Sequence, residues 1–327
     1  MAERAGRAPT LADVARVAGT STAVVSYVMN NGPRPVAAKT RERVLAAAAE
    51  LDYRPNLIAR ALRSRTTGVV GLILPEASNP YFGALARHVE QALDTRGKLT
   101  LIGNAGYSPE RQEHLVDKFL AAQVDGLIIV SADGGTQVTR AGVPAVYVHN
   151  RPVDGQAPVV AAVNEAAVQE AITHLHGHGH TRIAFLSGPC DAGPVGERHA
   201  AWAALAGTAA PLLRCAYYRA AAAALTGQLI GEGAMPAALI TATDEQAIGV
   251  LAGARAHGLA VPERLAVISL DGTPDSAFTA PALTVTQQPL EVMAAQAVDL
   301  LLDGETAVLS APAPLIVRAS CGCDPAA

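Results

Sequence analysis

The sequence is poor in aromatic residues, charges and cysteines for its length of 327 residues. Aromatic residues make up 4% and charged residues 17% of the chain, whereas 50% of the residues are hydrophobic. A core can therefore form, but aliphatic side chains and alanine must fill most of it. The longest apolar runs are shorter than the roughly 18 residues that a transmembrane helix needs. The first residues, MAERAGRAPT, lack the apolar region of a secretory signal, so we expect a cytoplasmic protein without membrane contact.

The four cysteines, Cys190, Cys215, Cys321 and Cys323, are too few and too scattered for a disulfide framework. The CGC segment that ends at Cys323 could bind a metal, but the sequence holds no second cysteine pair. We therefore interpret all four as reduced thiols of a cytoplasmic protein, and we expect neither a metal site nor a cofactor.

The segment HLHGHGH at 174–180 holds four of the nine histidines. Such a tract can bind metal or act as a pH switch. Helical periodicity in the preceding residues places His174 and His176 in the last turn of a helix, about 200° apart around its axis. Gly177 or Gly179 then ends the helix. We interpret the tract as a helix end and not as a shared metal site.

The net charge of −4 hides an asymmetry along the chain. Residues 1–65 hold 11 basic and 5 acidic residues, a balance of +6, and the remainder holds 14 and 24, a balance of −10. A basic segment ahead of an acidic body indicates contact with a polyanion. A solvated basic surface would have the same composition, so charge alone does not decide.

The basic segment shows the pattern of a helix-turn-helix. Thr10 is placed to cap a first helix, Gly19 suits the turn, and Ser21 is placed to cap a second helix. A third helix is expected at about 39–52. The residues predicted to face inward are Leu11, Val14, Ala15, Ala18, Val24, Val25, Val28, Val44, Leu45, Ala48 and Leu51. Any small three-helix bundle shows this spacing.

In a helix-turn-helix the second helix enters the major groove, and its first residues reach the base edges. The candidates here are Thr22, Ala23, Ser26 and Tyr27. None is the arginine, asparagine or glutamine that makes bidentate contacts to a base. Phosphate contacts would then supply much of the affinity.

A short helix is predicted in NLIARALR, after Pro55, and a polar linker in SRTTG. A helix of about eight residues is marginal in water, so it would form only against a partner copy and DNA. Leu62, flanked by arginines, fits a wedge in the minor groove. We divide the chain into a helix-turn-helix domain at 1–54, a hinge helix with linker at 55–67, and a body at 68–327.

The body alternates short apolar runs, such as GVVGLIL, RIAFLSG and LAVISLD, with helical stretches. This alternation predicts an α/β fold of parallel sheets with helices on both faces. More than eight strands over about 260 residues indicate two lobes. Ligands bind such sheets beyond the carboxyl ends of the strands, which points to the cleft between the lobes.

Polar and aromatic side chains follow these strands and suit a polyhydroxylated or heterocyclic ligand. Asp244 also suits a simple helix cap. The candidates are Asn79, Tyr81, Phe82, His149, Asn150, Arg198, Trp202, Asp244 and Asp271.

TLADVARVAGTS, KTRERVLAAAAELDYRPNLIARALR and SNPYF, in this order, resemble the lactose-repressor family of bacterial transcription regulators, and the resemblance covers nearly the whole chain. It implies a homodimer on a pseudo-palindromic operator and a two-lobed body like that of periplasmic binding proteins. Paired hinge helices would insert Leu62 at the central step, with Asn56 and Ala59 in the minor groove. The family's phosphate-contacting positions correspond to Thr10, Ser21, Asn30 and Thr40.

The resemblance also bears on the effector site, where it adds Gln288 to the candidates, and either Tyr217 or Tyr218 is expected to stack on the ligand. The chain departs from the family pattern at several positions. Tyr27 stands for an arginine, Ala37 for a serine, Pro194 for a serine, Ala201 for a glycine and Thr243 for an asparagine. These departures leave a sugar, a nucleoside-like ring or another effector open.

Two other classes of protein compete with this interpretation. A periplasmic solute-binding protein would share the architecture of the body, but the basic segment at 1–65 argues against this class. An α/β enzyme with a helical domain would need a catalytic motif, and neither G-x-S-x-G nor a phosphate-binding G-x-x-x-x-G-K-[ST] occurs. We therefore expect a sequence-specific DNA-binding regulator, a repressor and not an enzyme, controlled by a small effector bound between two lobes.

Overall fold

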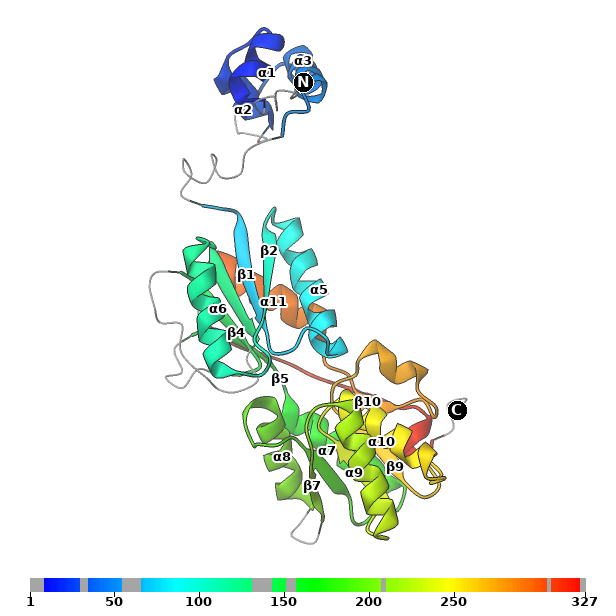
Figure 1. Cartoon of the computed structure of the whole chain (residues 1–327). Coiled ribbons are helices and arrows are strands. Elements are labelled where there is room, and N and C mark those ends of the chain that lie inside the picture. Colours follow the sequence, from blue (N-terminus) through cyan, green and yellow to red (C-terminus); the bar gives the residue numbers. More distant parts are fainter. Residues whose placement is uncertain are drawn as a thin grey trace, which may run out of the picture. The chain divides into compact units, whose positions relative to one another are not determined.

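The computed structural model describes residues 9–29, 35–54, 66–130, 143–150, 157–206, 210–304 and 307–323. The chain divides into two compact units, Met1–Thr67 and Gly68–Ala327, which we call the head and the body (Figure 1). Among the described helices, none is long and apolar enough to cross a membrane.

The head contains three helices, α1 (Leu11–Val17), α2 (Thr22–Met29) and α3 (Ala38–Glu50). Thr10 and Asp13 form a capping box at the start of α1, and Ser21 Oγ accepts from the Val24 backbone N–H at 3.3 Å. Gly19 adopts a left-handed φ of +60° in the turn, a conformation that glycine reaches without strain. The predicted caps and turn are therefore confirmed.

The core of the head consists of small aliphatic side chains from all three helices. Val14, Val25 and Val44 are fully buried at its centre. Leu45 was predicted to face inward but is 46% exposed, because it lies about 100° around the helix from Val44. The predicted sites at Asn30, Asn56, Ala59 and Leu62, and most of the predicted hinge, lie outside the described residues.

The body has two lobes, each built on a six-stranded sheet with helices on both faces, which confirms the predicted architecture. The N-lobe comprises the described residues within 68–162 and 290–311, and the C-lobe comprises those within 164–286 and 315–323. The N-lobe elements are β1 (Val69–Leu74), α5 (Pro80–Thr95), β2 (Leu99–Asn104), α6 (Pro109–Ala121), β3 (Gly126–Val130), β4 (Ala145–Val148), β5 (Val159–Ala162), α11 (Leu290–Asp303) and β11 (Val308–Ala311).

The N-lobe sheet is parallel, with strand order β11-β5-β4-β3-β1-β2. Helix α6 packs on one face, and α5 with α11 packs on the other (Figure 1). Two cores result, one on each face of the sheet, which is why β1, β3 and β4 read as continuous apolar runs.

The C-lobe repeats this plan, with strand order β12-β10-β9-β8-β6-β7 and only the β10–β12 pair antiparallel. Helices α7 and α8 cover one face, and α9 and α10 cover the other. The elements are α7 (Asn164–Gly177), β6 (Ala184–Ser187), α8 (Gly193–Ala206), β7 (Leu212–Arg214), α9 (Arg219–Gly231), β8 (Ala238–Thr241), α10 (Asp244–Ala256), β9 (Ala266–Ser269), η1 (Pro274–Phe278), β10 (Thr284–Thr286), β12 (Leu315–Ile316) and η2 (Ala319–Cys321).

The described chain passes between the lobes at three places: after β5, between β10 and α11, and between β11 and β12. Strand β11 and helix α11 therefore belong to the N-lobe although they follow the C-lobe in sequence. These crossings join the two lobes so that the carboxyl ends of β1, β4, β6 and β9 lie around one cavity.

Two glycines of α10, Gly249 and Gly253, allow α9 and α10 to pack closely. A Cβ at Gly249 would lie 2.2 Å from the backbone oxygen of Arg219. We predict that Gly249→Ala lowers the free energy of unfolding by about 1–3 kcal/mol, the usual cost of overpacking. Gly231→Ala, at a helical glycine with open space around its Cβ position, should be neutral or slightly stabilising. Equal urea midpoints for the two variants would contradict this explanation of the packing.

Candidate functional site

The head exposes the first two of the four residues that the sequence predicts to enter the major groove. Thr22 and Ala23 begin α2 and are exposed, whereas Val25 and Val28, on the other side of the helix, are buried in the core. Ser26 and Tyr27 are half-buried. The first turn of α2 is therefore free to meet a partner without disturbing the core of the head.

The body holds a cavity of about 330 Å³ between the lobes. This volume lies at the lower end of the range of about 300–1,000 Å³ for small-molecule sites. Seven of the predicted effector residues line it: Asn79, Tyr81, Phe82, His149, Arg198, Asp271 and Gln288. They come from five separate segments of the two lobes and the connection between them.

A buried ion pair forms the C-lobe side of this cavity. Arg198 Nη1 donates to Asp271 Oδ1 at 2.9 Å, and the two side chains are 4% and 8% exposed. Arg198 Nε also donates to Asn164 Oδ1 at 2.9 Å, and Nη1 donates to the backbone oxygen of Ala242. These partners hold the guanidinium group in one orientation.

On the N-lobe side of the cavity, Tyr81 forms hydrogen bonds that lead to the Arg198–Asp271 pair through Gln288. Its hydroxyl donates to Gln288 Oε1 at 2.6 Å and therefore accepts from His149 Nε2 at 2.8 Å. Gln288 Nε2 lies 3.5 Å from Asp271 Oδ1. Since Gln288 sits on the connection between β10 and α11, the chain of contacts joins both lobes. We call it the inter-lobe network: His149, Tyr81, Gln288, Asp271, Arg198 and Asn164.

Burial shifts the titration of this network. Burial lowers the pKa of His149 to about 3, and Arg198 adds to the effect, so the imidazole is neutral near pH 7. Burial raises the pKa of Asp271 to about 6, although the charge of Arg198 opposes the shift. Above this pH the carboxylate balances the guanidinium, and the lining residues carry no net charge.

Aromatic rings gather around the cavity although the chain contains few of them. Tyr81, Phe82, Tyr107, Tyr217 and Tyr218 all line it. Tyr107, from the N-lobe, and Tyr217, from the C-lobe, approach with ring centroids 5.8 Å apart. The cavity therefore combines flat apolar faces with neutral hydrogen-bonding groups.

Three predicted effector residues lie elsewhere. Asp244 accepts from Ser269 Oγ at 2.5 Å and from the Thr273 backbone N–H at 2.6 Å, so its carboxylate fastens α10 to the loop after β9. Trp202 stacks on Phe185 in the C-lobe core. Asn150 is buried but does not line the cavity. Neither Asp244 nor Trp202 lines the cavity: the first fastens a loop and the second packs in the core, so ligand contact by these two residues stays a prediction.

The structure adds cavity residues that the sequence analysis missed. Tyr107 lies beyond the carboxyl end of β2 and has a left-handed φ of +57°. Its position after a strand was a usable signal, but only the fold shows that β2 ends beside the cleft. Pro189 and Cys190 also line the cavity, as do Pro194 and Thr243, which the sequence analysis named only as departures from the family pattern. Tyr217 and Tyr218, which the sequence offered as alternatives, are both present.

The neutral state of His149 predicts a pH dependence of stability. Below pH about 6.5 the unfolded chain gains a proton on this histidine that the folded chain, with a pKa of about 3, does not. Stability therefore falls as the pH is lowered. Between pH 7 and pH 5 the free energy of unfolding should fall by about 2 kcal/mol more in the wild type than in His149→Gln.

Urea titrations of both proteins at the two pH values test this prediction. The readout is the change with pH and not the absolute stability, because glutamine is strained at the φ of +77° found at position 149. Identical changes with pH in the two proteins would show that His149 titrates normally.

Two protein families each match a part of this chain, one within the head and one within the body. Residues 10–56 match the bacterial regulatory proteins of the lacI family, and residues 172–321 match the periplasmic binding protein-like domain. The chain is 33% identical over 304 residues to catabolite control protein A of Priestia megaterium, covering 89% of this chain and 91% of that protein. It is 35% identical over 316 residues to the HTH-type transcriptional regulator MalR of Streptomyces coelicolor, covering 90% and 89%.

Solved structures agree with this assignment. A lac repressor dimer bound to operator and the anti-inducer ONPF superimposes with a TM-score of 0.85 at 27% identity, covering 96% of this chain and 99% of that one. The regulator CelR in complex with cellobiose gives a TM-score of 0.68 at 29% identity, covering 95% and 99%. Fold and site thus define a DNA-binding transcription regulator. The chain belongs to the lacI family of bacterial regulatory proteins.

Proposed function

We propose that this protein is a repressor that binds a pseudo-palindromic operator as a homodimer and responds to an uncharged, hydroxyl-rich effector in the inter-lobe cavity. The proposal of an uncharged effector rests on the inter-lobe network. Arg198 and Asp271 are the two charged residues that line the cavity, and their charges cancel. A ligand that binds there touches groups of both lobes at once.

The chemistry of the lining favours a sugar or a nucleoside-like compound over an anion. Aromatic rings such as Tyr107 and Tyr217 offer flat faces on which a sugar or a base can stack. Arg198 is already neutralised by Asp271, so an effector phosphate would have no free counter-charge among the lining residues. The neutral imidazole of His149 and the amide of Asn79 suit hydroxyl groups.

The relatives support the same assignment. A protein that is 30% identical over 311 residues is the ribose operon repressor of Escherichia coli. The similar structures include the lac repressor dimer on its operator and CelR with cellobiose. Repression of an operon that handles a small carbohydrate is therefore the proposal that these relatives favour.

Control of DNA binding would follow from movement of the lobes. An effector that prefers one arrangement of the lobes shifts the population toward it. Because the head precedes the N-lobe directly in sequence, we propose that the segment 55–67 transmits this shift between the helix-turn-helix domain at 1–54 and the body at 68–327.

A thermal-shift screen of the full chain with neutral sugars, nucleosides and their phosphate esters tests the effector class. A neutral compound should raise the melting temperature and change the affinity for operator DNA in a gel shift. The same compound should have no effect on the melting of Arg198→Met, which lacks the central donor of the cavity. A phosphate ester as the sole ligand would contradict the proposal of an uncharged effector.

The predicted minor-groove wedge is tested separately. Leu62→Ala should weaken binding to operator DNA by roughly one to two orders of magnitude, since unstacking and bending energies are a few kcal/mol. Its binding to unrelated duplex DNA, which depends on phosphate contacts, should change little. Equal losses on both DNAs would exclude the wedge.

A further inference from the structure

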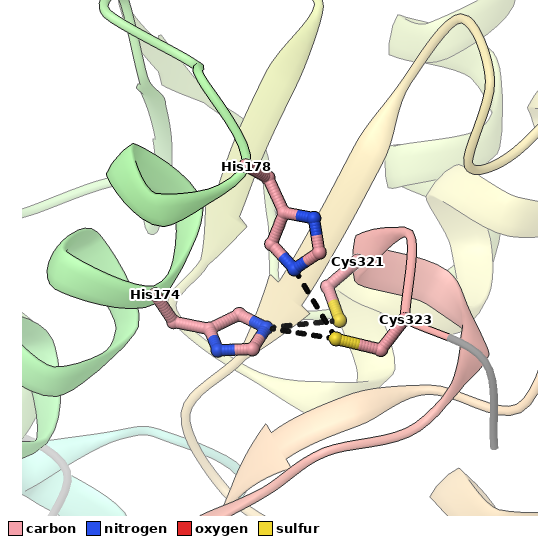
Figure 2. Close-up of side chains that lie close together, drawn as sticks. All are labelled: His174, His178, Cys321 and Cys323. Atoms are coloured by element: carbon pink, nitrogen blue, oxygen red, sulfur yellow. Dashed lines mark hydrogen bonds between the residues drawn. The ribbon is translucent and has the colours of Figure 1, made fainter. Parts of the chain in front are cut away.

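Two segments that the sequence analysis treated separately meet in the C-lobe. His174 lies in the last turn of α7 and His178 is its C-cap, while Cys321 ends η2 and Cys323 follows two residues later. Figure 2 shows both imidazoles and both thiols pointing toward one common space. The CGC segment therefore has a second ligand pair, supplied by histidines and not by cysteines.

The distances among the four side chains are within several tenths of an ångström of a tetrahedral ligand set for most of the N···S pairs. Cys321 Sγ lies 3.2 Å from His174 Nε2, and Cys323 Sγ lies 3.2 Å from His178 Nε2. Cys323 Sγ lies 3.6 Å from His174 Nε2, and all four ligand atoms lie within 4.8 Å of one another. Zinc bonds of about 2.3 Å to sulfur and about 2.0–2.1 Å to nitrogen give N···S edges of about 3.6 Å in a tetrahedron.

The local backbone explains how the ligands converge. His174 and His178 are four residues apart at a helix end, so their side chains lie on one face of α7. Gly322, between the cysteines, has a left-handed φ of +100°, which turns the chain so that both thiols face this helix. His176, on the same turn of α7, is exposed and outside the group.

The surroundings resemble those of a structural metal site. Cys321 is buried, and Thr284 Oγ1 lies 3.1 Å from its sulfur, within donating distance. A hydroxyl donor of this kind supports a thiolate ligand from outside the ligand set. Cys323 and His174 are half-buried and His178 is exposed, so an ion can enter from solvent.

We propose that His174, His178, Cys321 and Cys323 bind one Zn²⁺ in a closed, structural site. Four protein ligands with two sulfurs and two nitrogens favour zinc in tetrahedral geometry and leave no position open for a substrate. Both cysteines bind as thiolates, and their two protons pass to solvent.

The proposed ion would fasten the end of the described chain to the C-lobe. The segment after β11 returns to this lobe through β12, which has only two residues and pairs with β10. Zinc would tie the following turn, η2, to α7. The opposite end of α7 carries Asn164, which holds Arg198 at the cavity, so the metal would steady the helix on which the effector site rests.

Metal analysis of the full chain, purified without a histidine tag, tests the site. The wild type should contain about one Zn²⁺ per chain. Cys323→Ser and His178→Ala replace the more accessible ligands, so both variants should stay folded and lose most of the zinc. His176→Ala and Cys215→Ser are the matched controls, because they change the same residue types outside the group, and both should retain the metal.

Cobalt substitution supplies a second readout. Metal-free wild type titrated with Co²⁺ should develop the visible bands of tetrahedral cobalt and a thiolate-to-cobalt charge-transfer band, with one equivalent per chain. Zn²⁺ should raise the melting temperature of the wild type and of His176→Ala, but not that of Cys323→Ser. Failure of the reduced wild type to take up either ion stoichiometrically, or full zinc content in both ligand variants, would overturn the proposal.

Discussion

Replacing Asp271 by leucine should lower the free energy of unfolding by about 3–5 kcal/mol, the cost typical of removing one partner from a buried ion pair. Arg198 would keep its bonds to Asn164 and to the Ala242 oxygen but would lose its only carboxylate partner among the described ion pairs. Its side chain is 4% exposed, so water replaces that partner only poorly.

Urea denaturation above pH 6, where Asp271 is ionised, measures this effect. The fluorescence of Trp202, the single tryptophan of the chain, reports on the C-lobe core in which it is buried. Because the residual charge of Arg198 causes the loss, Arg198→Met combined with Asp271→Leu should recover most of the stability.

Asp275→Leu serves as the matched control. Asp275 pairs with Arg219 at 2.8 Å in the same lobe, but the two side chains are 47% and 44% exposed. Such surface pairs contribute less than about 1 kcal/mol. A loss in Asp271→Leu no larger than that in Asp275→Leu would mean that the Arg198 pair does not organise the cavity wall.

Replacing Ala23 by glutamate should reduce operator binding by on the order of 100-fold or more, because a like charge brought against an interface costs several kcal/mol. Ala23 is exposed in the first turn of α2, the part of the helix expected to meet the base edges. A carboxylate at a helix N-terminus interacts favourably with the helix dipole, so the head should remain folded.

Gel shifts at two salt concentrations, with circular dichroism as a check of folding, measure this effect. Ala46→Glu adds the same charge at an exposed position of α3 and should bind the operator within a few-fold of the wild type. A chain that lacks residues 1–67 should bind no DNA but should keep its thermal response to the effector. DNA binding by that chain, or equal losses in the two glutamate variants, would refute the role of α2.

The elements that the sequence predicted well are those whose signal is local. Thr10 and Ser21 cap helices through bonds that span three residues, and buried strands such as β1 and β9 appear as short apolar runs. The shortest strands, β7, β10 and β12, escaped prediction because two or three residues carry too little periodicity.

The candidate site was predicted in part, since the carboxyl ends of parallel strands collect ligand-binding residues. That rule selects positions after strands but does not tell which side chains reach the cavity. Asp244 and Trp202 follow strands as Asp271 and Arg198 do, yet one fastens a loop and the other fills the core. Tyr107 was missed because nothing near it in sequence marks it as a neighbour of Tyr217.

The sequence by itself determined the class of fold, the helix-turn-helix and the edge of each sheet at which we expect a ligand, because these follow from periodicity, caps and strand order over short distances. Only the tertiary structure decided which distant side chains meet. Tyr81 and Gln288 are 207 residues apart and share a hydrogen bond, and His174 and Cys321, 147 residues apart, come within 3.2 Å. Such long-range contacts depend on how the chain crosses three times between the two lobes. No local pattern of residues encodes the distances between these side chains.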